Sequence, residues 1–227
     1  STACVYGGFT NVLDDCGNGN SAIAGAAANS IGVSASYDLG GGWTAALGYA
    51  GEGSSTDGIL TKVGQDLYAG QVAYTADSYG ISLTMANVES ATKVSTTLNE
   101  YYPDTTYYAV NAYWTPEETG IVPSISVGFE NGNVESDDTT ETDTNQWFVG
   151  FQWDEAGPGT LGIAAGSNGA VASDDNEDLN MYEAFYTYPV NDNVAITPAI
   201  YLQETADTAT ASVDDITGVM IKTSFSF

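Results

Sequence analysis

The chain lacks histidine altogether and is poor in basic residues. Its 227 residues include 3 Lys and Arg against 30 Asp and Glu, which gives a net charge of −27. Without histidine a Ser/His/Asp triad and a Cys/His dyad are both excluded. Phosphate binding needs clusters of Lys or Arg, which Lys62, Lys93 and Lys222 cannot supply, so we expect no nucleic-acid partner.

Long hydrophobic runs are also missing. No segment approaches the roughly 18 consecutive apolar residues of a transmembrane helix, so any membrane association must come from strands or from the surface. The N-terminus has neither the charged nor the apolar region of a signal peptide, and we expect that a signal, or more, precedes Ser1. Acidic chains with few aromatics are often disordered, but this one has 15 Tyr, 7 Phe and 4 Trp, so disorder is not expected.

Only two cysteines are present, Cys4 and Cys16. An even number in a chain that looks exported predicts a small disulfide loop, and two free thiols are the alternative. A zinc site would need more ligands than the surrounding sequence offers. We expect no cofactor here.

Carboxylates abound, but their pattern does not indicate a catalytic or metal site. Those in the loop at 135–143 are typical of a solvated charged surface rather than of an acid/base pair. The run DDNED at 174–178 could gather Ca²⁺ but lacks the ligand spacing of a calcium loop. With no nucleophile–base pair, we expect that the protein is not an enzyme and holds no specific metal.

Alternation of apolar and polar residues dominates the rest of the chain. In a β-strand it places the two sets on opposite faces. Short turns rich in Gly, Asp, Asn or Pro, such as Gly40–Gly42, join the alternating segments, and every second connection is a longer acidic loop. The pattern predicts an all-β chain of about eleven antiparallel strands. They are expected over residues 30–39, 43–50, 66–75, 79–88, 106–115, 123–130, 146–154, 160–166, 181–188, 194–203 and 217–227.

Aromatic residues lie near the ends of the apolar strand faces. Amphipathic rings at both ends of an apolar band are typical of the interfacial girdle of a membrane barrel. The final strand ends on an aromatic residue, as a closing strand does at the periplasmic interface. We expect interface aromatics at Trp43, Tyr49, Tyr79, Trp114, Trp147, Trp153, Tyr182, Tyr188, Phe225 and Phe227. The sequence therefore predicts an antiparallel transmembrane β-barrel of the outer-membrane porin type, with its C-terminus at the periplasmic face.

The opposite strand faces are small or polar. Closing a sheet into a barrel would turn them inward, where they line a water path. The pore-lining candidates are Asp38, Asn111, Tyr113, Glu130, Gln146, Gln152, Asp154, Glu183, Tyr201, Gln203 and Lys222. Lys222 either pairs with lumenal carboxylates or is simply solvated. The acidic surface should favour cations near the mouth of such a pore.

Three segments carry a resemblance to a known family. They are YGGFTNVLDDCGNGN (Tyr6–Asn20), MYEAFYTYPVNDNVAITPAIY (Met181–Tyr201) and TGVMIKTSFSF (Thr217–Phe227). Each resembles the cyanobacterial outer-membrane porins, which are related to the carbohydrate-selective porins. The resemblance implies a homotrimer of barrels of about sixteen strands each, in a precursor that also carries an S-layer-homology domain. It further implies passive transport of small hydrophilic solutes and inorganic ions, iron among them.

The strand count suggests how the chain is divided. A closed single-chain barrel needs an even number of strands, and eleven is odd. We expect residues 1–29 to be an extracellular loop segment with the disulfide, and 30–227 to be barrel strands, incomplete at the N-terminus. A twelfth strand built from Ala3–Thr10 is the alternative.

The predicted function is a porin in the outer membrane of a cyanobacterium-like bacterium, with lipid, other copies of the chain and small solutes as partners. The competing hypothesis is a secreted or surface-attached acidic β-protein, such as an adhesin or appendage subunit. In that protein the apolar strand faces would form a dry core.

Overall fold

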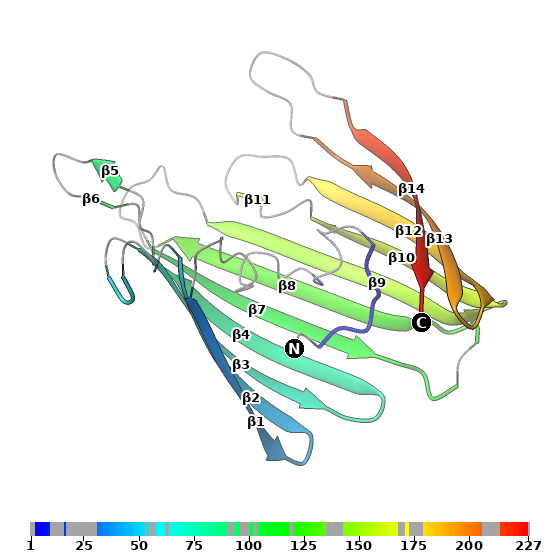
Figure 1. Cartoon of the computed structure of the whole chain (residues 1–227), viewed down its shortest axis with the longest axis horizontal. Coiled ribbons are helices and arrows are strands. Elements are labelled where there is room, and N and C mark those ends of the chain that lie inside the picture. The colour runs from blue at the N-terminus through cyan, green and yellow to red at the C-terminus, as the bar shows by residue number, and fades with distance from the viewer. Residues whose placement is uncertain are drawn as a thin grey trace.

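The computed structural model describes residues 3–9, 16, 31–52, 54, 58–61, 64–89, 93–95, 100–101, 104–118, 120–134, 143–167, 171–172, 179–205 and 214–226. Its elements are all β-strands, and eleven long strands form one antiparallel sheet in sequence order (Figure 1). Among these residues there is no helix with the length and apolar character that a membrane span requires. The all-β, antiparallel prediction is confirmed.

The long strands lie close to the predicted segments. They are β1 (Ile31–Gly40), β2 (Trp43–Glu52), β3 (Gln65–Thr75), β4 (Tyr79–Val88), β7 (Thr105–Trp114), β8 (Ser124–Val134), β9 (Thr144–Ala156), β10 (Gly159–Ser167), β12 (Asn180–Asn191), β13 (Val194–Gln203) and β14 (Ile216–Phe225). Three short strands were not predicted: β5 (Lys93–Ser95) pairs with β6 (Glu100–Tyr101), and β11 (Val171–Ala172) pairs with β9. They are too short to show an alternating pattern.

Short turns lie at one end of the sheet and longer connections at the other. The turn at Gly40–Gly42 has φ values of 83°, 62° and 88°, which glycine adopts without strain. Phe225 pairs with Val194, directly after the turn at 191–193, so the last strand ends at the short-turn end. The predicted alternation of short and long connections is therefore present with one exception: the connection at 115–123 between β7 and β8 is as long as the one at 135–143 between β8 and β9.

The sheet is open between its two edges. β1 pairs only with β2 and β14 only with β13 within the described chain, and Figure 1 shows the curved sheet with these strands at its two sides. Residues 3–9 form no strand, so the alternative of a twelfth strand from Ala3–Thr10 is wrong for the residues that are described. The predicted final strand ends at Phe225, and Phe227 lies outside the described residues.

The one buried apolar cluster in the described chain lies where the N-terminal segment meets the sheet. It comprises Tyr6, Cys16, Phe148, Ala164, Met181, Phe185 and Ala199. The sheet contributes these residues from the face that carries Ser82, Asn111 and Ser126, which we call the polar face. The opposite face, which we call the apolar face, is largely exposed.

Candidate functional site

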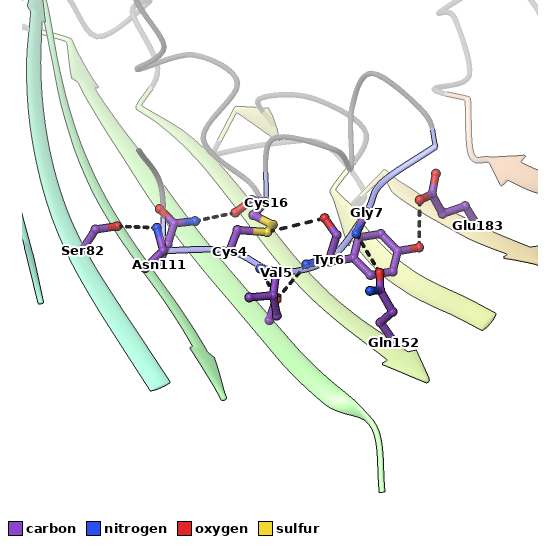
Figure 2. The surroundings of a disulfide bond; sticks show 11 residues. Cys4, Val5, Tyr6, Gly7, Cys16, Ser82, Asn111, Gln152 and Glu183 are labelled. Carbon is purple, nitrogen blue, oxygen red and sulfur yellow. Dashed lines mark hydrogen bonds between the residues drawn. A yellow bond between two sulfur atoms is a disulfide. The ribbon is translucent and has the colours of Figure 1, made fainter. Parts of the chain in front are cut away.

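The N-terminal segment crosses the polar face as an extended strap. We define the strap as residues 3–9 together with Cys16. Its backbone N–H groups donate to side chains of four strands. Ala3 N donates to Ser82 Oγ of β4 at 3.1 Å, and Val5 N and Tyr6 N donate to Ser126 Oγ of β8 at 3.1 and 3.2 Å. Gly7 N donates to Gln152 Oε1 of β9 at 2.9 Å (Figure 2). Phe9 N donates to Glu183 Oε1 of β12 at 3.0 Å.

A disulfide between Cys4 and Cys16 closes the strap into a loop, as the sequence predicted. Cys16 is fully buried, and Asn111 Nδ2 of β7 donates to its carbonyl oxygen at 2.8 Å. Gly128 of β8 lies beneath it, where a Cβ atom would collide with the same oxygen. Phe9 therefore lies at β12, and Cys16 lies at β7 and β8.

Glu183 anchors the far end of the strap. Its side chain is 3% exposed, and its Oε1 accepts from the Tyr6 hydroxyl at 2.8 Å as well as from Phe9 N. The Tyr6 ring packs at a tilt against Phe148 and Phe185, with ring centroids 5.4 and 5.8 Å apart. Burial, and then the Glu183 charge, raises the pKa of Tyr6 above its usual range, so its hydroxyl stays a neutral donor.

All eleven pore-lining candidates lie on the polar face, as the strand registers show. Asn111, Gln152 and Glu183 contact the strap. Glu130 and Gln146 are buried and are paired directly across β8 and β9, and Tyr113 and Gln203 are half-buried. The residues share a face without forming one cluster.

Three further candidates are exposed, and one packs on the apolar cluster. Asp38 and Lys222 lie on the two edge strands, and Asp154 accepts from Gln152 Nε2 at 2.7 Å. Tyr201 packs against the apolar cluster. No ion pair joins Lys222 to a carboxylate in the described part of the chain.

Several residues that hold the strap were not singled out by the sequence. Ser82 and Ser126 are small polar residues in alternating strands and look like any others there. Phe148 and Phe185 depart from the polar pattern of their faces, and this departure was the one available signal that something covers them.

The apolar face carries the aromatic residues in two rows. Five strands each have two aromatics six residues apart, which is roughly 20 Å along a strand. They are Trp43 and Tyr49, Tyr68 and Tyr74, Tyr108 and Trp114, Trp147 and Trp153, and Tyr182 and Tyr188.

Contacts between strands link these rings. Trp43 and Tyr74 have ring centroids 5.0 Å apart, Tyr74 and Tyr79 are 5.9 Å apart, and Tyr49 and Tyr68 are 5.4 Å apart. Nine of the ten predicted interface aromatics lie on this face. The tenth, Phe227, lies outside the described residues. Tyr68, Tyr74 and Tyr108 belong to the same rows and were not predicted.

The described residues hold no group of three or more Asp, Glu, Cys or His side chains placed to bind a metal. The acidic run at 174–178 and most of the loop at 135–143 lie outside them. No protein-family model, curated protein or solved structure matches the chain.

Proposed function

We propose that this sheet is the wall of an outer-membrane porin, a passive channel for small hydrophilic solutes and inorganic ions. The observation that carries the proposal is the exposed apolar face with its two rows of aromatics. Leu47 and Leu83, between the rows, are 71% and 59% exposed. Soluble monomers rarely expose apolar patches beyond a few hundred Å², whereas a membrane barrel presents such a band to lipid.

The burial pattern also weighs against the competing hypothesis. An acidic adhesin or appendage subunit would bury its apolar strand faces and expose its polar ones. Here the polar face holds most of the buried residues, among them Ser82, Asn111 and Ser126, and the apolar face is largely exposed. This pattern supports a lumen on the polar side and lipid on the other.

The strap supplies the constriction in this proposal. It lies across the polar face from β4 to β12, so it would narrow the water path along that part of the wall. Carboxylates outnumber amines on the described polar face, where Asp38, Asp154 and Glu183 stand against Lys222. The imbalance favours cations. The C-terminus at the periplasmic face and a homotrimeric assembly complete the proposal.

Planar-bilayer conductance tests the proposal. Detergent-purified protein should insert and give discrete steps in KCl, and a salt gradient should give a reversal potential of the sign that cations produce. The same preparation, unfolded before addition, is the control. A protein that stays monomeric in plain buffer after detergent removal, and gives no steps, would contradict the porin.

A further inference from the structure

The hydrogen bonds of the strap share one direction. The N–H groups of Ala3, Val5, Tyr6, Gly7 and Phe9 all donate toward the sheet, to acceptors on β4, β8, β9 and β12. Three of these residues, 5 to 7, are consecutive. In a β-strand successive N–H groups point in opposite directions, so this arrangement is specific to the strap.

Peptide geometry then fixes where the carbonyl groups point. In a trans peptide the C=O of one residue lies opposite the N–H of the next, and no cis peptide bond occurs in the described chain. The carbonyls of Cys4, Val5, Tyr6 and Gly8 therefore point away from the sheet. Cys4 Sγ is 3.9 Å from the Tyr6 oxygen, but it is oxidised in the disulfide and has no hydrogen to donate.

We propose that these carbonyl oxygens form a row that contacts inorganic cations at the constriction and gives the channel its cation preference there. The inference rests on the proposed porin function, because it needs water on the far side of the strap. Carbonyl dipoles that face a pore take the place of part of an ion's hydration shell. A row on one side leaves most of that shell in place, so the expected preference is moderate and admits monovalent cations generally.

The carbonyl row differs from carboxylates in two measurable ways. The field of exposed loop carboxylates falls off within the Debye length, about 10 Å at 0.1 M salt and about 3 Å at 1 M. Carboxylates also lose their charge below their ordinary pKa values of about 4. A carbonyl contact in the lumen is insensitive to pH and acts at short range.

Ser126 is the residue through which the row can be tested. Its Oγ accepts from both Val5 N and Tyr6 N, so Ser126→Ala leaves two N–H groups without their acceptor. A buried N–H donor without an acceptor is costly, so we expect these peptides to turn toward lumenal water. N–H donors would then stand where the Cys4 and Val5 carbonyls stood.

Ser124→Ala is the matched control. Ser124 is buried on the same face of β8, two residues away, and makes no hydrogen bond to the strap. Both variants remove one hydroxyl from the same strand, so a difference between them reports on the strap rather than on the fold of the sheet.

The experiment measures reversal potentials of the full chain in KCl gradients at about 1 M mean salt, at neutral pH and again near pH 3, below the carboxyl pKa values. We expect the wild type and Ser124→Ala to prefer cations in both conditions, and the permeability ratio of Ser126→Ala to fall towards unity. A preference that disappears at high salt or acid pH, or equal ratios for the two variants, would overturn the carbonyl row and leave the porin standing. Absence of any conductance would instead count against the porin itself.

Discussion

At the scale of single residues, Glu183 and Ser126 hold the strap by accepting two hydrogen bonds each. Both are almost fully buried on the polar face. A buried carboxylate is costly unless it is hydrogen-bonded, and the Tyr6 hydroxyl and Phe9 amide meet that need for Glu183. Buried hydrogen bonds at these two residues therefore hold the strap to the sheet.

Replacing Tyr6 by Phe should loosen the strap without unfolding the sheet. The change removes the hydroxyl that donates to Glu183, and a hydrogen bond to a charged group contributes about 1.5–3 kcal/mol. We expect amide hydrogen exchange of residues 5–9 to speed up about ten-fold or more, as that range of free energy implies.

Tyr201→Phe is the comparison for this change. Tyr201 packs against the same apolar cluster, but its hydroxyl makes no hydrogen bond among the described residues. In the Tyr201→Phe variant the amides of the strap should exchange at the wild-type rate. Equal exchange in the two variants would show that the Tyr6–Glu183 bond does not hold the strap.

The sequence could predict the face on which each residue lies, but not what covers that face. Asn111, Gln152 and Glu183 were expected on the polar side because alternation depends on local spacing alone. Their contacts with the strap join residues 95, 145 and 174 positions apart, which no local pattern records. Phe148 and Phe185 were also passed over, because their contact with Tyr6 is distant in the sequence.

At the scale of elements, the long strands follow directly from alternation and turn chemistry. β4 (Tyr79–Val88) and β13 (Val194–Gln203) match the predicted segments at both ends. The strap differs because it forms no strand and takes its shape from the sheet beneath it. Its conformation depends on distant acceptors and on one covalent link.

Reduction of the disulfide between Cys4 and Cys16 should widen the channel. The two cysteines are separated by 12 positions in the sequence. A disulfide that closes a loop of this size stabilises the folded state by about 3 kcal/mol, because it restricts the unfolded chain. The strands pair independently of it. We expect larger and noisier single-channel conductance after a thiol reductant is added, with the sheet still folded by circular dichroism.

A variant with Cys4→Ser and Cys16→Ser provides the control for reduction. It should show the enlarged conductance from the start and no response to reductant. Unchanged conductance of the reduced wild type would mean that the sheet contacts alone fix the strap.

At the scale of the whole molecule, the two faces of the sheet differ in polarity and in burial. The apolar face exposes large side chains between two rows of aromatics, whereas the polar face carries the strap and most of the buried residues. Alternation could reveal this division, but a sandwich shows it too. The burial of the polar face, visible only in the structure, is the observation that favours the proposed porin over a sandwich.

Leu47→Lys should destabilise the protein in lipid. Leu47 lies in the middle of the apolar face of β2, and Lys at the bilayer midplane costs about 2–4 kcal/mol. Denaturant titration of the protein folded into lipid vesicles measures this cost. Ala46→Lys, the neighbouring residue on the polar face, should cost far less because its side chain would enter water.

A soluble protein would give a different result. Leu47 is already exposed, and surface substitutions usually change stability by less than about 0.5 kcal/mol. Near-neutral values for both variants would place water on both sides of the sheet.

In the proposed porin, the open edges of the sheet determine how the protein can enter a membrane. β1 and β14 both run toward the short-turn end, so pairing them directly would be parallel, and an antiparallel closure takes an odd number of strands between them. While β1 and β14 lack an outer partner, each edge presents a line of unpaired N–H and C=O groups, and each such group costs several kcal/mol in hydrocarbon. Insertion of β1 and β14 should therefore come last, at the moment of closure, and an assembly factor that caps an exposed strand edge would act on these two strands first.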